Sequence, residues 1–251
     1  MSELRKAIVT GAGSGIGRAV AIALLKYNFN VTVVGRREEA LKETVQMAGE
    51  YESNALVAAG DVSNPDTVEK IFKLHLNRFN RLDLLFNNAG VAPAGKPIEE
   101  FPVSEWKRVV DINLTGSFLC AQQAVKIMKS QIPRGGRIVN NGSVSAQVVR
   151  PNAVAYNSTK HAILGLTKSI CLEGREYGIC CTQLDIGNAE VERTKSMRNG
   201  VLQPDGAVKP EALMDVKNIA KTILYLVDLP LEANVPYLTI TANNMPFIGR
   251  G

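Results

Sequence analysis

Short apolar runs alternate with longer stretches of mixed polarity along the whole chain. An apolar run of about four to eight residues bounded by glycine or polar residues is typical of a buried strand, whereas the longer stretches have helical spacing. We expect seven strands, at residues 6–10, 31–34, 55–59, 82–86, 136–140, 180–186 and 237–241. Helices are expected at residues 15–27, 38–50, 65–78, 104–130, 155–176 and 216–226.

The alternation of strands and helices predicts parallel strands joined by right-handed crossovers. No internal repeat, low-complexity tract or linker marks a second domain, so residues 1–251 are expected to form one doubly wound α/β domain with a mainly parallel, seven-stranded sheet. In such sheets ligands bind beyond the carboxyl ends of the strands. Five residues that follow predicted strands are expected to cluster there: Gly11, Asp61, Asn88, Ser143 and Gly187.

A glycine-rich turn joins the first predicted strand to the first predicted helix. Residues 11–17 read Gly-Ala-Gly-Ser-Gly-Ile-Gly. Glycines permit a sharp turn and close approach of a ligand, and the free N–H groups that begin a helix favour an anion such as pyrophosphate. Ile16 stands where the general dinucleotide fingerprint has its third glycine. Such a loop is often only a flexible turn, but its place between strand and helix favours nucleotide binding.

Tyr156 and Lys160 lie four residues apart in a predicted helix, and Ser143 lies thirteen residues before Tyr156. Positions i and i+4 share one helix face, so the ammonium is expected beside the phenol. A nearby cation lowers the pKa of a tyrosine from its reference value of about 10, and such a tyrosine can act as general acid or base. Taken alone, the pair more often means an amphipathic tyrosine beside a snorkelling lysine on a helix surface.

Together with Asn87-Asn88-Ala89-Gly90, Asn113 and Ser143, these motifs resemble the short-chain dehydrogenase/reductase family in its compact form, over nearly the whole chain. The resemblance implies a Rossmann fold that binds a nicotinamide cofactor, and a catalytic tetrad of Asn113, Ser143, Tyr156 and Lys160. It also implies a set of cofactor-binding residues: Gly11, Ser14, Gly15, Ile16, Gly17, Arg36, Asp61, Val62, Asn88, Ala89, Gly90, Tyr156, Lys160, Ile186 and Gly187. Asp61 and Val62 would meet the adenine ring.

The end of the second predicted strand favours NADP over NAD. An NAD site places Asp or Glu there, about twenty residues past the glycine turn, to accept a hydrogen bond from the ribose 2′-hydroxyl. This chain has Gly35 and Arg36 instead. Glycine leaves room for a 2′-phosphate, and a guanidinium binds phosphate through paired hydrogen bonds. Alternatively, Arg36 and Arg37 merely begin a solvated helix, and Ser14 offers no second basic contact.

The resemblance implies a role for each member of the tetrad. In carbonyl reduction NADPH would deliver hydride to the carbonyl carbon while Tyr156 protonates the oxygen, and Ser143 would donate a hydrogen bond to that oxygen. Lys160 would also hold the nicotinamide ribose, and Asn113 would anchor a water that returns protons. Taken singly, Asn113 can be a satisfied amide at a helix bend, and Ser143 a hydroxyl that caps local backbone.

Composition limits the other function classes. Apolar residues make up 45% and charged residues 21%, as in ordinary globular proteins. The net charge of +5 is scattered without a dense basic run, so nucleic-acid binding gains little support. We expect no membrane span and no secretory signal, and four cysteines without C-x-x-C spacing suggest a reduced, cytoplasmic protein. With two histidines and no ligands at metal spacing, no catalytic metal is expected.

Three segments bear on substrate and assembly. The family's Pro-Gly pair is replaced by Ile186-Gly187, and its glycine-rich tail by residues 243–247. Residues 188–215 correspond to the family's mobile substrate lid, although they can equally be a plain surface loop.

The long helices expected at residues 104–130 and 155–176 pair with symmetry mates in the family, which implies a homo-oligomer, a tetramer or a dimer. Ile163, Leu166 and Ile170 are the expected apolar contacts, unless they face only their own sheet. Trp106 is expected to serve packing.

Two functions from different classes remain. The favoured one is an NADP(H)-dependent oxidoreductase that acts on a small-molecule alcohol/carbonyl pair; the alternative is a non-catalytic NADP(H)-sensing or scaffolding protein on the same fold. A sensor has no need of the complete tetrad, which favours the enzyme.

Overall fold

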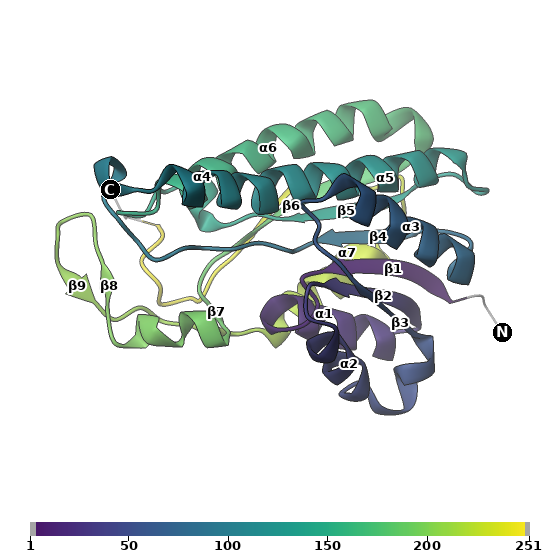
Figure 1. Cartoon of the computed structure of the whole chain (residues 1–251), viewed down its shortest axis with the longest axis horizontal. Coiled ribbons are helices and arrows are strands. Elements are labelled where there is room, and N and C mark those ends of the chain that lie inside the picture. Colours follow the sequence, from purple (N-terminus) through teal and green to yellow (C-terminus); the bar gives the residue numbers. More distant parts are fainter. Residues whose placement is uncertain (1–3, 249–251) are drawn as a thin grey trace.

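A sheet of seven parallel strands organises the protein, whose computed structural model describes residues 4–248 (Figure 1). The strands are β1 (Arg5–Thr10), β2 (Phe29–Gly35), β3 (Ala55–Ala59), β4 (Leu84–Asn87), β5 (Gly136–Asn141), β6 (Ile179–Ile186) and β11 (Tyr237–Ile240). Their order across the sheet is β3-β2-β1-β4-β5-β6-β11, and every neighbouring pair is parallel. The predicted doubly wound α/β fold is confirmed, and each strand lies within a few residues of its expected place.

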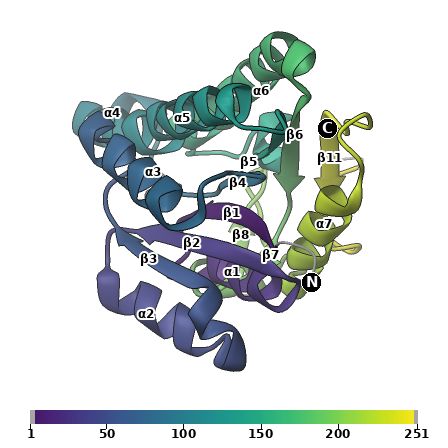
Figure 2. The same cartoon turned by 90° about the vertical axis from the view of Figure 1, so that its right-hand side faces the viewer.

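Helices cover both faces of the sheet (Figure 2). One face carries α1 (Gly15–Lys26), α2 (Glu38–Gln46) and α7 (Lys217–Asp228); the other carries α3 (Pro65–Phe79), α4 (Val103–Val110), α5 (Gly116–Ser130) and α6 (Val154–Gly174). Successive strand residues point to opposite faces. In β1, Ala7 and Val9 therefore enter one apolar core while Ile8 enters the other. Strands buried on both faces explain the continuous apolar runs in the sequence.

The helix expected at residues 104–130 is present, but a π-helical turn, Asp111–Thr115, lies within it and joins α4 to α5. Within that turn the Asn113 side chain bonds to the backbone of Val91 on both its donor and its acceptor side, at 2.9 and 2.8 Å. Gly116 then packs against Val62, so closely that a Cβ there would lie 2.9 Å from the valine Cγ2. One extra residue in a turn hardly alters hydrophobic periodicity, so the sequence pattern did not reveal it. Such bulges are frequent at functional sites.

Residues 188–215 contain short paired elements. β7 (Ala189–Glu190) pairs in parallel with β10 (Met214–Asp215), and β8 (Val201–Leu202) pairs antiparallel with β9 (Val208–Lys209). A 3₁₀ segment, Glu192–Arg198, joins the first strand to the hairpin. The β8–β9 hairpin stands out from the body of the molecule beyond the carboxyl ends of the main strands (Figure 1).

Among the described helices, none combines the length and apolar character needed to cross a membrane. Within residues 4–248, no group of three or more His, Cys, Asp or Glu side chains is arranged to hold a metal ion.

Candidate active site

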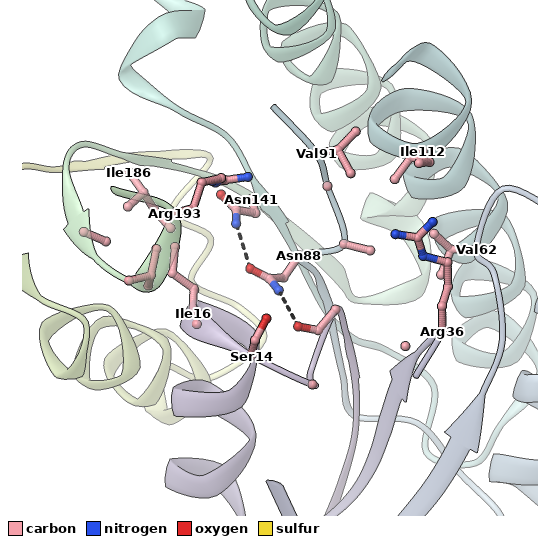
Figure 3. A pocket seen from close by; sticks show the side chains of 18 of the residues that line it. Ser14, Ile16, Arg36, Val62, Asn88, Val91, Ile112, Asn141, Ile186 and Arg193 are labelled. Carbon is pink, nitrogen blue, oxygen red and sulfur yellow. Dashed lines mark hydrogen bonds between the residues drawn. The ribbon is translucent and has the colours of Figure 1, made fainter. Parts of the chain in front are cut away.

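A cavity of about 790 Å³ lies at the carboxyl ends of the central strands, within the size range of small-molecule sites (Figure 3). Fourteen of the fifteen expected cofactor-binding residues line it: Gly11, Ser14, Gly15, Ile16, Arg36, Asp61, Val62, Asn88, Ala89, Gly90, Tyr156, Lys160, Ile186 and Gly187. Gly17 does not line the cavity. Two members of the tetrad, Asn113 and Ser143, do not line the cavity either. Their sequence neighbours Ile112 and Gly142 do.

The glycine turn forms a cradle that suits a phosphate group. Gly11 and Gly15 have φ values of +66° and +53°, a left-handed backbone that favours glycine. A Cβ at Gly17 would collide with the carbonyl oxygen of Gly11, so this glycine lets α1 begin directly against the turn. Ser14, the N-cap of α1, makes no side-chain hydrogen bond to the first N–H groups of the helix. The first N–H groups of α1 lie at the positive end of the helix dipole, next to the cavity, where they would stabilise an anion.

Hydrogen bonds connect the glycine turn to Lys160. The Asn88 amide donates to the carbonyl oxygen of Thr10 at 2.9 Å. It also donates to the carbonyl oxygen of Gly11 at 3.4 Å and accepts from the side chain of Asn141 at 2.8 Å (Figure 3). Lys160 Nζ donates to the backbone oxygen of Asn141 at 2.6 Å. Asn141 was missed in the sequence, although it adjoins Gly142 and Ser143 at the end of a predicted strand.

Tyr156 and Lys160 lie together on α6, as their spacing predicts. Lys160 Nζ is 5.6 Å from the centroid of the Tyr156 ring, and the lysine is buried. Burial alone would raise the pKa of Tyr156, but the charge of Lys160, a hydrogen bond with Ser143 and the charges of Arg193 and Arg150 together hold it below its ordinary value. Burial lowers the pKa of Lys160, against which the charges of Tyr156 and Asp185 act. A phenol with a lowered pKa suits proton transfer.

Ser143 is held from two sides. Its backbone N–H donates to Asp185 Oδ1 at 2.9 Å, and its Oγ accepts from the N–H of Ser145 at 3.1 Å. With an acceptor position of the hydroxyl occupied, its own proton remains available for donation to Tyr156 or to a substrate oxygen.

The Asn113 side chain bonds to the backbone of Val91 and donates to Thr159 Oγ1 at 3.4 Å, and its backbone oxygen accepts from Ser117 Oγ at 2.8 Å. The side chain of Asn113 is therefore a hydrogen-bonded amide at a helix bend, as the alternative interpretation of the sequence had it.

The far end of the cavity contains the expected adenosine contacts. Asp61 Oδ1 accepts from the backbone N–H and the hydroxyl of Ser63 at 2.9 and 2.8 Å. Burial opposes ionisation of Asp61, but these bonds and the charge of Arg36 lower its pKa. Among the described residues Arg36 forms no ion pair, and it lines the cavity together with Val62 (Figure 3). No carboxylate stands at the end of β2, where Gly35 and Arg36 line the cavity.

Residues from the 188–215 segment close one side of the cavity: Val191, Glu192, Arg193 and Thr194 line it. The sequence indicated a lid here only by analogy and named none of these side chains. Behind them, Glu211 accepts hydrogen bonds from Arg150 at 2.7 and 3.1 Å, from Asn188 at 2.7 Å and from Gln203 at 3.0 Å. This carboxylate ties the segment to the loop that precedes α6.

Ile186-Gly187 and residues 243–247, the two segments that depart from the family pattern, lie in contact. Ile186 lines the cavity, and Gly187 packs beneath the C-terminal segment, where a Cβ would lie 2.6 Å from Met245 Sδ. Met245 is buried, so residues 243–247 help to support this wall of the site.

The chain belongs to the short-chain dehydrogenase family, because residues 5–201, most of its length, match the family described as "short chain dehydrogenase". The family resemblance predicted from the motifs is confirmed. Members of this family are oxidoreductases that use a nicotinamide cofactor, and this chain is accordingly an oxidoreductase that acts on hydroxyl or carbonyl groups.

One relative is named for its action on a steroid. A 3beta-hydroxysteroid dehydrogenase of Mediterraneibacter gnavus is 40% identical over 177 residues, which are 70% of this chain and 63% of that protein. The matched segment thus spans less than two thirds of that relative.

Two solved structures share the fold along almost their whole length. A 3-ketoacyl-(acyl-carrier-protein) reductase of Brucella melitensis, complexed with NADH, has a TM-score of 0.83 and 25% identity, with 94% of this chain and 96% of that one covered. An actinorhodin polyketide ketoreductase with NADPH has a TM-score of 0.85 and 28% identity, with 96% and 97% covered.

Proposed function

We propose that the protein is an NADP(H)-dependent oxidoreductase that interconverts a carbonyl compound and its alcohol, with Tyr156 as the general acid and base. The observation that carries this proposal is the pair of half-buried Tyr156 and buried Lys160 at the wall of the 790 Å³ cavity. When bound, the cofactor supplies or accepts the hydride. The glycine cradle, the unpaired first turn of α1 and the cavity volume all fit such a molecule.

The residues of this chain would move the proton and stabilise the charge. In reduction, Tyr156 donates its proton to the carbonyl oxygen as negative charge develops there. Ser143, held by Asp185 and Ser145, donates a hydrogen bond to the same oxygen. Lys160 keeps the phenol acidic and lines the cavity where the ribose next to the nicotinamide would lie. In oxidation the same groups act in reverse, with the phenolate as base.

Asn113 is proposed to act through the shape of the π-turn. Its side chain is engaged by Val91, so the proposed water that returns protons to the site would be held by the backbone of this turn and not by the amide.

The proposed preference for NADP rests on the adenosine end of the cavity. Arg36 has no ion-pair partner among residues 4–248, and no Asp or Glu at the end of β2 would repel a 2′-phosphate. A guanidinium can bind that phosphate with two parallel hydrogen bonds. Since structural relatives carry NADH or NADPH, the preference follows from this chain's own residues.

A non-catalytic sensor is disfavoured, because the tetrad is complete and the phenol is tuned for proton transfer. The direct test is a screen of ketones, sugars and acyl carbonyls in which the loss of NADPH absorbance is followed with and without each compound. We expect carbonyl-dependent oxidation of NADPH by at least one class. NADPH binding without turnover of any class would instead favour the sensor.

A further inference from the structure

Asp185, one residue before the cavity-lining Ile186, is a buried carboxylate next to the proposed catalytic residues. It is 5% exposed at the carboxyl end of β6. Its oxygens accept three hydrogen bonds, from the N–H of Ser143 at 2.9 Å, from Gln183 at 2.8 Å and from Gln147 at 2.7 Å. All three donors are neutral, and no Lys or Arg among residues 4–248 forms an ion pair with Asp185.

A buried carboxylate without an ion pair is costly, and its three hydrogen bonds offset part of that cost. A role for the negative charge of Asp185 in the active site would explain why a carboxylate is buried there.

The backbone next to Ser143 is shaped around this carboxylate. Gly142 lies against Asp185 so closely that a Cβ there would overlap Oδ1. Its N–H also donates to the carbonyl oxygen of Leu184 at 2.9 Å, which fixes the end of β5 against β6. The glycine therefore lets the carboxylate reach the N–H of Ser143, and this contact sets the direction in which the Ser143 side chain leaves the backbone.

Lys160 lies close to the same carboxylate, because its Nζ bonds to the backbone oxygen of Asn141 at 2.6 Å and Asp185 Oδ1 lies against the next residue, Gly142. Lys160 faces Tyr156 on its own helix, Arg193 from the lid segment and Asp185 from β6. Burial and, less strongly, Arg193 lower the pKa of Lys160, whereas Tyr156 and, less strongly, Asp185 raise it. Asp185 is thus the one carboxylate among these neighbours that opposes the loss of the lysine proton.

We propose that Asp185 is a positioning residue of this active site, whose carboxylate orients Ser143 and whose negative charge keeps Lys160 in its ammonium form. The proposal rests on the proposed function for its meaning in catalysis. Its two halves can be separated experimentally, because one depends on the place of the carboxylate and the other on its charge.

Asp185→Asn removes the charge at nearly constant shape and keeps an oxygen that can accept from Ser143. Lys160 can be titrated by carbon NMR in protein labelled at the lysine ε carbon, with its signal assigned by its absence in Lys160→Ala. We expect the pKa of Lys160 to fall in Asp185→Asn. Asp228→Asn is the matched control, because Asp228 bonds to Arg5 and Tyr27 at the opposite end of the sheet; it should leave the titration unmoved.

Gly142→Ala does the reverse, since the methyl group displaces the carboxylate while the charge remains. We expect turnover to fall ~10–100-fold, the cost of misplacing a group that contacts the reacting atoms. Thermal unfolding and NADPH binding would check that both variants fold. If Asp185→Asn does not fold, Gly142→Ala still tests the positioning half.

An unmoved Lys160 titration in folded Asp185→Asn, or full turnover in Gly142→Ala, would overturn the proposal. The NMR titration needs no substrate. A protein that reduces no carbonyl would therefore refute the proposed function without deciding the role of Asp185, which the titration decides separately.

Discussion

Lys160 Nζ lies 2.6 Å from the backbone oxygen of Asn141, and this contact fixes a buried ammonium at the side of Tyr156. Burial opposes the charge on Lys160, so the carbonyl acceptor and the nearby phenol stabilise it in place. Asn141 in turn bonds to Asn88 beside the glycine turn. The group that tunes the proposed acid is therefore held by the same network that shapes the cofactor cavity.

Lys160→Ala should impair both chemistry and cofactor binding. Without the ammonium, burial would raise the pKa of Tyr156, so the phenolate needed for alcohol oxidation would form only at higher pH. The rise of oxidation rate with pH should shift upward, and cofactor affinity measured by fluorescence should weaken. Lys73→Ala, which removes an exposed lysine paired with Glu69 on α3, should change neither. An unshifted pH profile in Lys160→Ala would refute the tuning role.

Arg36→Asp should narrow or reverse the preference for NADPH. The loss of a charge-assisted contact to the 2′-phosphate is worth roughly 1.5–3 kcal/mol, so NADPH affinity should fall ~10–100-fold. NADH affinity should not fall and serves as the internal control. Fluorescence titration of both cofactors measures the ratio. Equal affinities of the unmodified protein for NADPH and NADH would contradict the proposed preference for NADP.

Glu211→Gln should loosen the lid segment. The Glu211 side chain is fully buried against Arg150, and the variant leaves that guanidinium without its counter-charge. We expect the free energy of unfolding to fall by about 2 kcal/mol, measured by denaturant titration. Glu192→Gln, at an exposed pair with Lys195, should have almost no effect.

Glu211 should also make the stability of the protein depend on pH. Burial raises the pKa of Glu211, but hydrogen bonds from Arg150, Gln203 and Asn188 lower it to about 2. Because the folded-state pKa is depressed below its ordinary value of 4.5, the stabilisation is complete above that value and is lost as the pH falls toward about 2. The stability difference between the unmodified protein and Glu211→Gln should shrink over that range. A constant difference would contradict this origin.

Much of the fold could be predicted because local rules act on contiguous residues. Buried parallel strands leave apolar runs, and a helix fixes the i, i+4 relation of Tyr156 and Lys160. The fifteen expected cofactor-binding residues come from motifs, and fourteen of them line one cavity.

Contacts between distant segments were not predictable. Arg150 and Glu211 are 61 residues apart in the sequence, and Ser143 and Asp185 are 42 apart, so no spacing links them. Two of the contact residues expected for an oligomer were wrong for the same reason, because Ile163 and Ile170 are buried in the protomer. Leu166 is only partly buried, so its expected contact stays a prediction. A helical periodicity shows that a face is apolar but not what covers it. Trp106, expected to serve packing, remains 38% exposed.

We still expect a homo-oligomer, with further contacts. Phe118 on α5 and Leu172 on α6 are 46% and 67% exposed. Light scattering at micromolar concentration should give a tetramer or a dimer, and Phe118→Glu or Leu172→Glu should shift it toward smaller species. Leu74→Glu, at an exposed leucine of α3, is the matched control. A monomer in the unmodified protein would rule the prediction out.

Tyr156→Phe tests the proposed mechanism most directly, because it removes one oxygen and keeps the ring. With a substrate from the carbonyl screen, turnover should fall by ~10²–10⁴-fold, the usual scale for general acid–base catalysis, while folding and NADPH affinity stay nearly intact. Tyr225→Phe, at an exposed tyrosine of α7, should keep full activity. Turnover of Tyr156→Phe at the unmodified rate would contradict the assignment and move the proton transfer to another group.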